Sequence, residues 1–263
     1  MTEADHRPVS LTGVPETALW TLFNRATEPT FADPWAERLC EVLEYPYRQR
    51  FGSPSQMHPL RARAFDAETV DFLDLHPDAV VVALGEGLQT SYWRIGREVP
   101  WVSVDLPEVQ ELRAALLPAD TRAVTGSALD PGWMDAVPVD RPAIVTAEGL
   151  LMYFSEADAL GLIAACAARF PGGRMLFDTI PPWFSRRTLE GLAITEHYTA
   201  PPMPWGISVP AMRRLRVPGV AAVRELPWPS GRGLFRRPWP QVAMALPWVG
   251  GQRPASWALD FCS

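Results

Sequence analysis

The sequence predicts an α/β fold in which helices cover both faces of a mostly parallel sheet, and three observations support this prediction. Residues 80–83 form an apolar run that is typical of a strand buried on both faces. A glycine turn, Gly85-Glu86-Gly87, follows this strand, and a second apolar segment, 101–105, ends in an acid. Further short apolar segments alternate with helical patterns along the chain, as they do in doubly wound domains.

The glycine turn predicts a ligand-binding corner. Gly85 and Gly87 let the backbone turn sharply and approach a ligand, because neither residue carries a Cβ atom. A helical pattern starts at Leu88, so the turn is expected to lead into a helix N-terminus. Ligands of open α/β sheets bind beyond the carboxyl ends of the strands, where this turn lies. The alternative is a glycine turn that binds nothing.

Asp105 points to a nucleoside cofactor. It ends the second strand 20 positions after Gly85, where a carboxylate can accept hydrogen bonds from ribose hydroxyls. Thr90 occupies the position of the third glycine in a dinucleotide-binding G-x-G-x-x-G motif. This departure favours a cofactor without a pyrophosphate, such as S-adenosylmethionine (SAM), over NAD.

Composition and charge argue against several other classes of function. The chain has 263 residues, of which 48% are hydrophobic, so we expect one sizeable core and no independent second domain. The net charge is −6 without a basic stripe, which argues against a nucleic-acid partner. No apolar run reaches the roughly 18 residues of a membrane span, and the N-terminus is polar rather than a signal peptide. We therefore expect a cytoplasmic protein without a membrane partner.

Metal and lysine chemistry are not indicated. The three cysteines, Cys40, Cys166 and Cys262, are widely spaced and form no C-x-x-C pair, so neither a metal site nor a disulfide framework is expected. The 24 basic residues are all arginines. The absence of lysine excludes a Schiff base and a P-loop lysine.

Helical patterns precede the first strand of the sheet. Apolar residues recur at helical spacing over 11–26, and a second helix is expected over 34–43 with Asp33 as its N-cap. A third helix is expected from Arg61 to about Leu75. We expect residues 1–76 to form a helical cap that closes over the cofactor.

Arg61 and Arg63 lie two positions apart, so they do not share a helix face and should have different partners. One of them can bind a carboxylate through two parallel hydrogen bonds, as the methionine end of SAM requires. The other can pair with Asp66 or with a neighbouring element. Two solvated surface arginines are the alternative.

The cofactor-binding core is expected over residues 77–180. Its further expected elements are a helix over 107–116, strands over 122–125, 143–147 and 175–178, and a helix over 156–169 with Ser155 as its N-cap.

The tips of the third and fourth strands add candidate site residues. Ser127 and Asp130 follow the third strand, where a polar side chain can bind the adenine amine and an apolar one can cover the ring. Asp130 before Pro131 can equally cap a helical turn that has no ligand. Glu148 ends the fourth strand at the centre of the sheet, where it can receive the ammonium group of SAM.

Residues 181–217 are expected to form a substrate lid. The stretches 181–184 and 197–205 are rich in aromatic residues and prolines, which suits a semi-rigid apolar wall. Candidate substrate contacts are Trp183, Trp205 and Tyr153. Candidate catalytic residues are His197, as a base, and Tyr198, although a histidine in this place can simply pack.

The C-terminal region, 218–263, is expected to complete the sheet. Residues 220–226 and 241–247 alternate like an antiparallel pair and are expected to be its sixth and seventh strands. An exposed edge at 220–226 would allow a homodimer as well as a monomer.

The chain resembles the leucine carboxyl methyltransferase family, and especially its bacterial polyketide O-methyltransferase, tetracenomycin-type branch. The motifs that carry the resemblance occur in the family's order. They are LTGVPETALWTLFNRA at 11–26, RARAFD at 61–66, the glycine turn, VDLP at 104–107, EGLLMY at 148–153, FPG at 170–172 and FDT at 177–179.

The resemblance implies a seven-stranded, Rossmann-like SAM methyltransferase fold with an N-terminal helical cap and an aromatic, proline-rich lid. It implies that Arg61 binds the methionine carboxylate, that Asp105 binds the ribose and that Glu148 lies near the amino group. The cofactor-binding set that it implies is Arg25, Arg61, Gly85, Gly87, Asp105, Leu106, Ser127, Ala128, Leu129 and Glu148.

Two residues depart from the family pattern. Glu86 stands where a small residue is usual, and Gln89 replaces an acid. The expected function is a SAM-dependent O-methyltransferase acting on a small polyketide-like or aromatic acceptor, either a carboxylate, which needs no base, or a phenol, which benefits from one. The alternative is a SAM-fold protein that does not methylate and has a cyclase-like or binding role.

Overall fold

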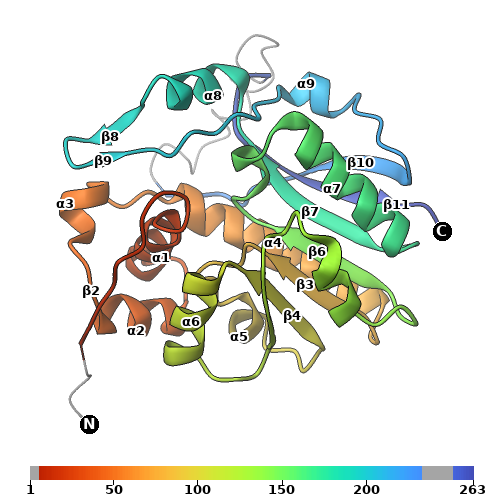
Figure 1. The fold of residues 1–263 in the computed structure, drawn as a ribbon, viewed down its shortest axis with the longest axis horizontal. Coiled ribbons are helices and arrows are strands. Elements are labelled where there is room, and N and C mark those ends of the chain that lie inside the picture. The colour runs from red at the N-terminus through yellow and green to blue at the C-terminus, as the bar shows by residue number, and fades with distance from the viewer. Residues whose placement is uncertain (1–5, 233–250) are drawn as a thin grey trace.

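A seven-stranded sheet forms the centre of the molecule in a computed structural model, which describes residues 6–232 and 251–263 (Figure 1). The strand order is β10-β11-β7-β6-β3-β4-β5. The seven-stranded α/β fold predicted from the sequence is therefore confirmed. The strands are β3 (Val80–Leu84), β4 (Trp101–Asp105), β5 (Arg122–Thr125), β6 (Ala143–Ala147), β7 (Arg174–Thr179), β10 (Val220–Leu226) and β11 (Ala255–Phe261).

The order of the parallel strands reverses at β3. Strands β4 and β5 follow on one side of β3, and β6 and β7 follow on the other, all parallel. The connections therefore leave β3 and β6 in opposite directions and open a crevice at the carboxyl ends of the strands. Open α/β sheets bind their ligands in this crevice.

Strand β11 completes the seven-stranded sheet of the described residues. Residues 241–247 lie outside the described residues, and β10 pairs instead with β11, which also pairs antiparallel with β7. The prediction of 241–247 as a strand paired with β10 therefore falls outside the described residues, among which the partner of β10 is β11. Strand β11 is buried on both faces along nearly its whole length, so its sequence ASWALDF lacks the alternation that marks a half-buried strand.

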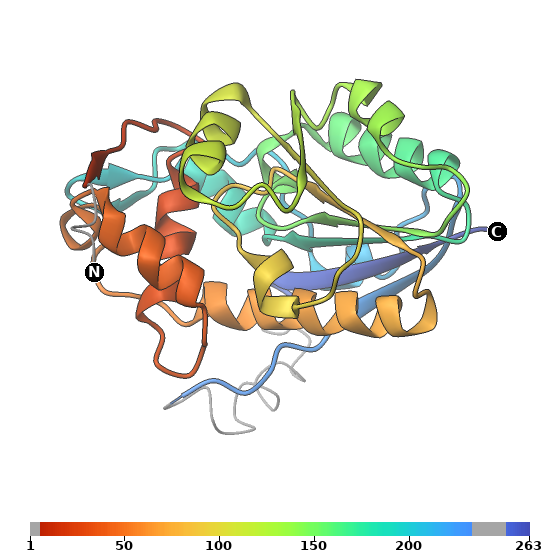
Figure 2. The same cartoon turned by 90° about the horizontal axis from the view of Figure 1, so that it is seen from below.

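Helices cover both faces of the sheet, as Figure 2 shows from below. On one face, Phe65 and Phe72 of α4 (Met57–Leu75) pack on Val81 and Ile144, beside α5 (Ser91–Ile95). On the other face, Ile163 of α7 joins a larger apolar cluster. The elements of that second layer are η1 (Pro131–Ala136), α7 (Glu156–Arg169) and α9 (Val209–Met212).

The N-terminal cap forms its own apolar cluster. It comprises α1 (Thr17–Thr27), α2 (Pro34–Val42), α3 (Tyr47–Phe51) and the short strands β1 (Arg7–Pro8) and β2 (Leu43–Glu44). Asp33 accepts a hydrogen bond from the Ala36 amide, which confirms its prediction as an N-cap. The proposed boundary at residue 76 is too late, because α4 begins at Met57 and packs on the sheet.

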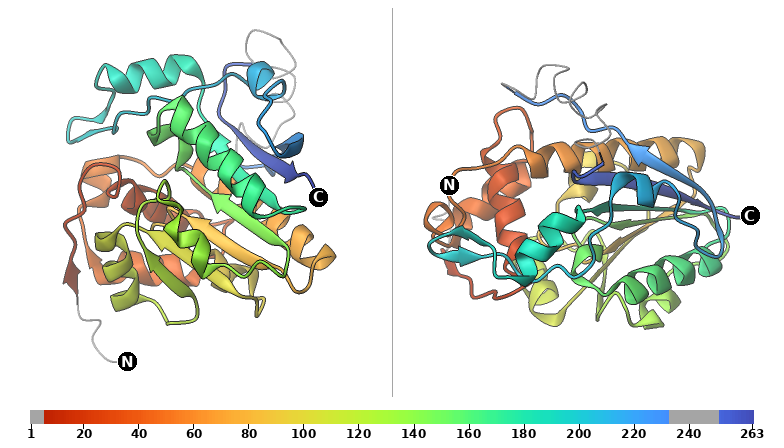
Figure 3. Two further views of the ribbon diagram at one scale, coloured as in Figure 1. Left: turned by 45° about the vertical axis from the view of Figure 1, so that its right-hand side comes forward. Right: turned by 90° about the horizontal axis from the view of Figure 1, so that it is seen from above.

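The segment after β7 reaches back to the cap. It runs through α8 (Pro182–Leu189) into a hairpin of β8 (Ala193–Thr195) and β9 (Tyr198–Thr199), which lies beside α3 in both views of Figure 3. Arg50 of α3 donates a hydrogen bond to the His197 carbonyl, and Thr195 Oγ1 donates one to the Arg50 carbonyl at 2.6 Å. The cap and the hairpin thus meet on the side of the crevice.

Two absences hold for the part of the chain that the structure describes. No helix there combines the length and the apolar character that a membrane crossing requires. The same residues contain no group of three or more histidine, cysteine or acidic side chains arranged to hold a metal ion.

Two further helices of the described residues are α6 (Pro107–Leu116) and η2 (Leu151–Tyr153).

Trp257→Ala should lower the free energy of unfolding by about 3–5 kcal/mol, because it empties a fully buried site in β11 and removes the 2.9 Å hydrogen bond to Thr179 Oγ1. Trp183→Ala is the matched control, since this tryptophan is 45% exposed and its loss should lower the free energy of unfolding by less than about 2 kcal/mol. Urea unfolding of both variants checks the assignment. Equal effects would contradict it.

Candidate cofactor and acceptor site

A single continuous cavity of about 570 Å³ lies at the carboxyl ends of β3, β4, β6 and β7. Its walls come from α1 of the cap, from the first turns of α4, from the glycine turn and from the segment after β7. This volume is within the range of cofactor pockets. The cavity has a charged end beside the glycine turn and an apolar end beneath α8 and β8.

The glycine turn has the geometry that requires glycine. Gly85 and Gly87 have φ values of 58° and 57°, in the left-handed region. A Cβ atom at Gly85 would lie 2.7 Å from Leu150 Cδ1, and one at Gly87 would lie 3.1 Å from Ala18 Cβ. The helix expected from Leu88 begins only at Ser91, because residues 86–89 continue the turn and Leu88 is fully buried.

Glu86 does not obstruct this turn. Its buried carboxylate lies 2.7 Å from Arg113 Nη2 of α6 and accepts a hydrogen bond from Trp101 Nε1. Arg113 Nη1 also donates to the carbonyls of Gly87 at 2.8 Å and Gln89 at 2.9 Å. Glu86, which departs from the family pattern, therefore pairs with a buried arginine that also fixes the backbone of the turn through hydrogen bonds.

Asp105 ends β4 and lines the cavity beside the turn. Its Oδ2 accepts from the Gly87 amide at 2.6 Å, and its Oδ1 accepts from the Leu106 amide at 2.8 Å. Each oxygen keeps a second lone pair that can bind a hydroxyl group. Burial raises the pKa of this carboxyl group above its ordinary value, despite the two amide donors.

The apolar wall beyond Asp105 suits a flat ring. Leu106, Ser127 and Ala128 line the cavity there, and the Ala128 carbonyl is held by Trp133 Nε1 at 3.0 Å. Leu129 does not line the cavity and is 40% exposed. Asp130 accepts a hydrogen bond from the Gly132 amide as the N-cap of η1. This is the helix-capping role that the sequence offered as the alternative to adenine binding.

Arg61 forms the centre of the charged end. Its Nε donates to Glu148 Oε1 at 3.0 Å, and its Nη1 donates to Asp178 Oδ2 at 2.9 Å. The two acids end the neighbouring strands β6 and β7, so one guanidinium bridges the strand tips. Arg61 has five N–H groups, which leaves donors for a further carboxylate. Arg63, by contrast, donates to the Thr30 carbonyl on the surface.

The carboxylate of Glu148 is oriented by hydrogen bonds and can bind a cationic group of a ligand. Gln89 Nε2 donates to its Oε1 at 2.9 Å, so the second departure from the family pattern contacts this acid directly. Burial raises the pKa of Glu148, while the nearby Arg61 opposes the shift. Glu148 and Asp178 both line the cavity, and their two negative charges face one bridging guanidinium.

Arg25 does not face the cavity, contrary to the prediction. Its side chain is fully buried, pairs with Asp33 and donates to the Leu88 carbonyl at 2.7 Å and to Thr90 Oγ1 at 3.0 Å. It therefore connects the cap to the back of the glycine turn. A sequence motif marks such a residue without telling which way its side chain points.

The opposite end of the cavity is apolar and aromatic. Tyr153, a predicted substrate contact, lines it, and burial raises the pKa of Tyr153 to about 12. Further apolar lining residues come from α1, η2, the lid segment and the chain after β10. They are Trp20, Phe154, Ile180, Phe184, Met203 and Trp228.

His58 is the one imidazole that lines the cavity among the described residues. Its ring stands edge-on to Trp20, with centroids 5.3 Å apart. Its Nδ1 lies 2.5 Å from Nδ2 of Asn24, whose Oδ1 accepts from the Ser55 amide at 2.9 Å. Nothing in the local sequence distinguishes this histidine from a packed one.

The aromatic residues predicted in the lid face elsewhere. Trp183 lies on the surface, and its Nε1 donates to the Gln252 carbonyl at 3.0 Å. Trp205 is buried against Phe177, with ring centroids 6.2 Å apart. Neither lines the cavity, so the prediction that they contact substrate is corrected. The lid contributes Phe184, Ile194 and Met203 instead.

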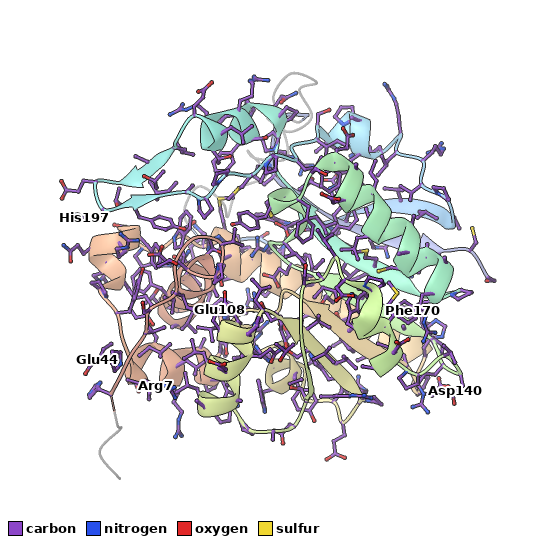
Figure 4. The ribbon with its side chains drawn as sticks, in the orientation of Figure 1. Arg7, Glu44, Glu108, Asp140, Phe170 and His197 are labelled. Atoms are coloured by element: carbon purple, nitrogen blue, oxygen red, sulfur yellow. The ribbon has the colours of Figure 1, made fainter. Side chains whose placement is uncertain are left out.

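His197 and Tyr198 are also away from the cavity. His197 lies at the outer tip of the β8–β9 hairpin, as Figure 4 shows, with its side chain 41% exposed beside Glu196. Tyr198 is buried against Phe51 of the cap, with ring centroids 4.9 Å apart. A base at His197 cannot reach an acceptor in the cavity, and Tyr198 packs the hairpin onto the cap.

Fold and site together define a SAM-dependent methyltransferase. The strand-tip acid Asp105 suits a ribose, the apolar wall at Ala128 suits an adenine, and the ionic cluster of Arg61, Glu148 and Asp178 suits the carboxylate and ammonium of an amino acid. The cavity thus offers a complementary group to each part of SAM.

Comparison with known proteins identifies the relatives of the chain. The tetracenomycin polyketide synthesis O-methyltransferase TcmP of Streptomyces glaucescens is 35% identical over 223 residues, which cover 81% of this chain and 82% of TcmP. The chain belongs to the family of SAM-dependent methyltransferases that includes TcmP, and its cofactor is SAM. A second relative, the SAM-dependent methyltransferase dpfgK of Gibberella zeae, is 27% identical over 204 residues, which cover 66% of this chain and 68% of dpfgK.

Solved structures agree on the fold. One solved structure, of a methyltransferase from Thermobifida fusca that is described as putative, superposes with a TM-score of 0.54 at 17% identity. The superposition covers 93% of this chain and 95% of the Thermobifida fusca chain. The CurJ carbon methyltransferase superposes with a TM-score of 0.52 at 13% identity, covering 95% and 68%. No family model matches the sequence, so the resemblance to leucine carboxyl methyltransferases stays a prediction.

Asp105→Asn should weaken SAM binding by about 10-fold to 100-fold, because it removes a charged hydrogen-bond acceptor from the cavity wall. Glu108→Gln is the matched control, since Glu108 is an exposed acid three positions away and should bind SAM as the wild type does. Titration calorimetry measures both affinities. An unchanged affinity in Asp105→Asn would place the ribose elsewhere.

The affinity for SAM should fall as the pH is lowered through the pKa values of Glu148 and Asp105, and it should do so above the ordinary carboxyl range near 4, because burial raises both pKa values. Protonation removes the charge that attracts the ammonium group, so binding is strongest above the raised pKa. Glu148→Gln should reduce this pH dependence, and the part due to Asp105 should persist. A pH dependence that Glu148→Gln leaves intact would show that Glu148 has no such role.

Proposed function

We propose that this chain transfers the methyl group of SAM to a carboxylate oxygen of a small, planar, polyketide-like aromatic acid. The observation that carries the proposal is the composition of the cavity, in which an ionic cluster at one end gives way to an aromatic chamber at the other. The name of TcmP, a polyketide synthesis O-methyltransferase, supports oxygen as the acceptor atom.

The proposal assigns the cofactor to the charged end. Bound there, SAM supplies a methyl group on a positively charged sulfur. Arg61 is suited to bind the methionine carboxylate, Glu148 and Asp178 to bind the ammonium, and Asp105 to bind the ribose. The fixed backbone of Gly85 and Gly87 lets the methionine part approach closely.

The titratable groups of the cavity favour a carboxylate over a phenol. Glu148 and Asp178 are engaged by Arg61, the pKa of Tyr153 is raised to about 12 by burial, and Nδ1 of His58 is engaged by Asn24. Of the other lining acids, Glu86 is paired with Arg113, and both oxygens of Asp105 accept hydrogen bonds from backbone amides. No described lining residue is thus arranged to take a proton from a phenol. A carboxylate is ionised at neutral pH, so its oxygen forms the new C–O bond as the methyl–sulfur bond breaks, sulfur keeps the electron pair and no proton moves.

Positioning then supplies the catalysis. The apolar chamber excludes water from a nucleophile that water would otherwise stabilise, and its aromatic walls fix the plane of the acceptor. Trp20, Phe184 and Trp228 come from three distant parts of the chain, so the chamber is complete only when the cap, the lid and the C-terminal region are together.

The departures that suggested a role without methylation do not favour that role in the fold. Glu86 pairs with Arg113 behind the turn, and Gln89 donates to Glu148. Whether the protein is a monomer or a homodimer stays a prediction, as does its cytoplasmic location.

Incubation with SAM and 2-naphthoate should yield S-adenosylhomocysteine and a methyl ester that mild base hydrolyses, whereas 2-naphthol of the same size should yield at least about tenfold less, because it needs a base. Mass spectrometry of both products measures the difference, with a reaction that lacks SAM as the inactive control.

A base-stable ether from 2-naphthol, with no ester from 2-naphthoate, would overturn the choice of carboxylate. Tight SAM binding without S-adenosylhomocysteine from either compound would favour the non-methylating alternative.

A further inference from the structure

His58 occupies the junction between the two ends of the cavity. It lies on the first turn of α4, three positions before Arg61, so the two side chains share one helix face. Trp20 and Tyr153, two walls of the aromatic chamber, line the same cavity. A polar group at this position is therefore placed where the acceptor meets the cofactor.

The hydrogen bonds behind His58 fix the state of its ring. Asn24 is fully buried, and its Oδ1 accepts from the Ser55 amide at 2.9 Å, so its Nδ2 must be the atom that faces His58. An amide nitrogen only donates, and Nδ1 of the imidazole at 2.5 Å must therefore accept. A neutral imidazole that accepts at Nδ1 carries its proton on Nε2.

The surroundings also keep the ring neutral. Burial lowers the pKa of His58 well below its ordinary value, and the positive charges of Arg61 on α4 and Arg25 on α1 lower it further. Protonation at Nδ1 would also place two N–H donors, Nδ1–H of His58 and Nδ2–H of Asn24, in direct contact. Nε2 has no hydrogen-bond partner among the described residues, on a ring that lines the cavity.

We propose that His58 determines acceptor specificity as a fixed hydrogen-bond donor, with Nε2–H binding one oxygen of the acceptor, and that it is not a base. The inference rests on the function proposed above. In a carboxylate, donation to one oxygen turns the other oxygen toward the charged end of the cavity. The ring cannot remove a proton, because Nε2 already carries one and Nδ1 is engaged by Asn24.

The first test measures the ring state directly. The protein has four histidines, so ¹⁵N-histidine labelling with saturating S-adenosylhomocysteine gives few signals, and those of His58 are absent from His58→Gln. We expect a protonated Nε2 and an unprotonated Nδ1 that do not change from about pH 5.5 to about pH 8, a range in which an ordinary histidine titrates.

The variant Asn24→Asp reverses the direction of the hydrogen bond between position 24 and His58. A carboxylate at this position can still accept from the Ser55 amide but can only accept from His58, so the proton should move to Nδ1. The NMR signal of Nδ1 should move to the position of a protonated ring nitrogen. Wild-type protein that already carries its proton on Nδ1 would overturn the proposal.

The second test measures binding of 2-naphthoate to protein saturated with S-adenosylhomocysteine. His58→Phe keeps a flat ring but no donor, and should bind 2-naphthoate about fivefold to tenfold more weakly, as the loss of one neutral hydrogen bond gives. His58→Gln, whose amide nitrogen can replace Nε2, should retain the affinity. Binding of SAM itself should be unchanged in both variants, which a general loss of structure would not allow.

The two proposals fail in different ways. Equal affinity of His58→Phe and His58→Gln for 2-naphthoate, in an enzyme whose wild type forms the methyl ester, overturns the donor role of His58 alone. The absence of S-adenosylhomocysteine from the wild type overturns the proposed function, and the ring state measured by NMR then still decides whether His58 is a donor.

Discussion

Two buried arginines hold the glycine turn from opposite sides, and the geometry of the site depends on them. Arg113 of α6 binds the carbonyls of Gly87 and Gln89, and Arg25 of α1 binds the carbonyl of Leu88 between them. Three consecutive carbonyls are thus satisfied by charged donors, which form stronger hydrogen bonds than neutral ones. Turn residues that lack regular helical hydrogen bonds gain a fixed conformation in this way.

Each of these buried arginines, like Arg61, pairs with buried acids. Arg25 pairs with Asp33, Arg113 with Glu86, and Arg61 with Glu148 and Asp178. Removing water from such charges costs several kcal/mol per ion, and the paired geometry offsets that cost only when both partners are present. Glu86, which departs from the family pattern, is therefore part of the support of the turn.

The sequence predicts most of the sheet and two of the strand-tip acids, Asp105 and Glu148, because both depend on local patterns. It does not mark Asp178, a third strand-tip acid that lines the cavity, as a site residue. Asp105 follows a short apolar strand, and its position at the carboxyl end places it in the crevice. The aromatic lid is different, since richness in rings does not tell which ring faces inward, and Trp205 packs against the core while Phe184 lines the cavity. His58 acquires its role from Asn24, 34 positions earlier, which no local pattern records.

The hydrogen bond from Arg25 to the Leu88 carbonyl has a consequence for ligand exchange. Swinging the cap away would expose a guanidinium that is now fully buried and would break the turn that holds the cofactor, so cap and turn behave as one rigid body. The β8–β9 hairpin is held to the same cap, because Tyr198 is buried against Phe51 and Arg50 donates to the His197 carbonyl. Moving the cap would therefore disturb the glycine turn on one side and the packing of the hairpin on the other.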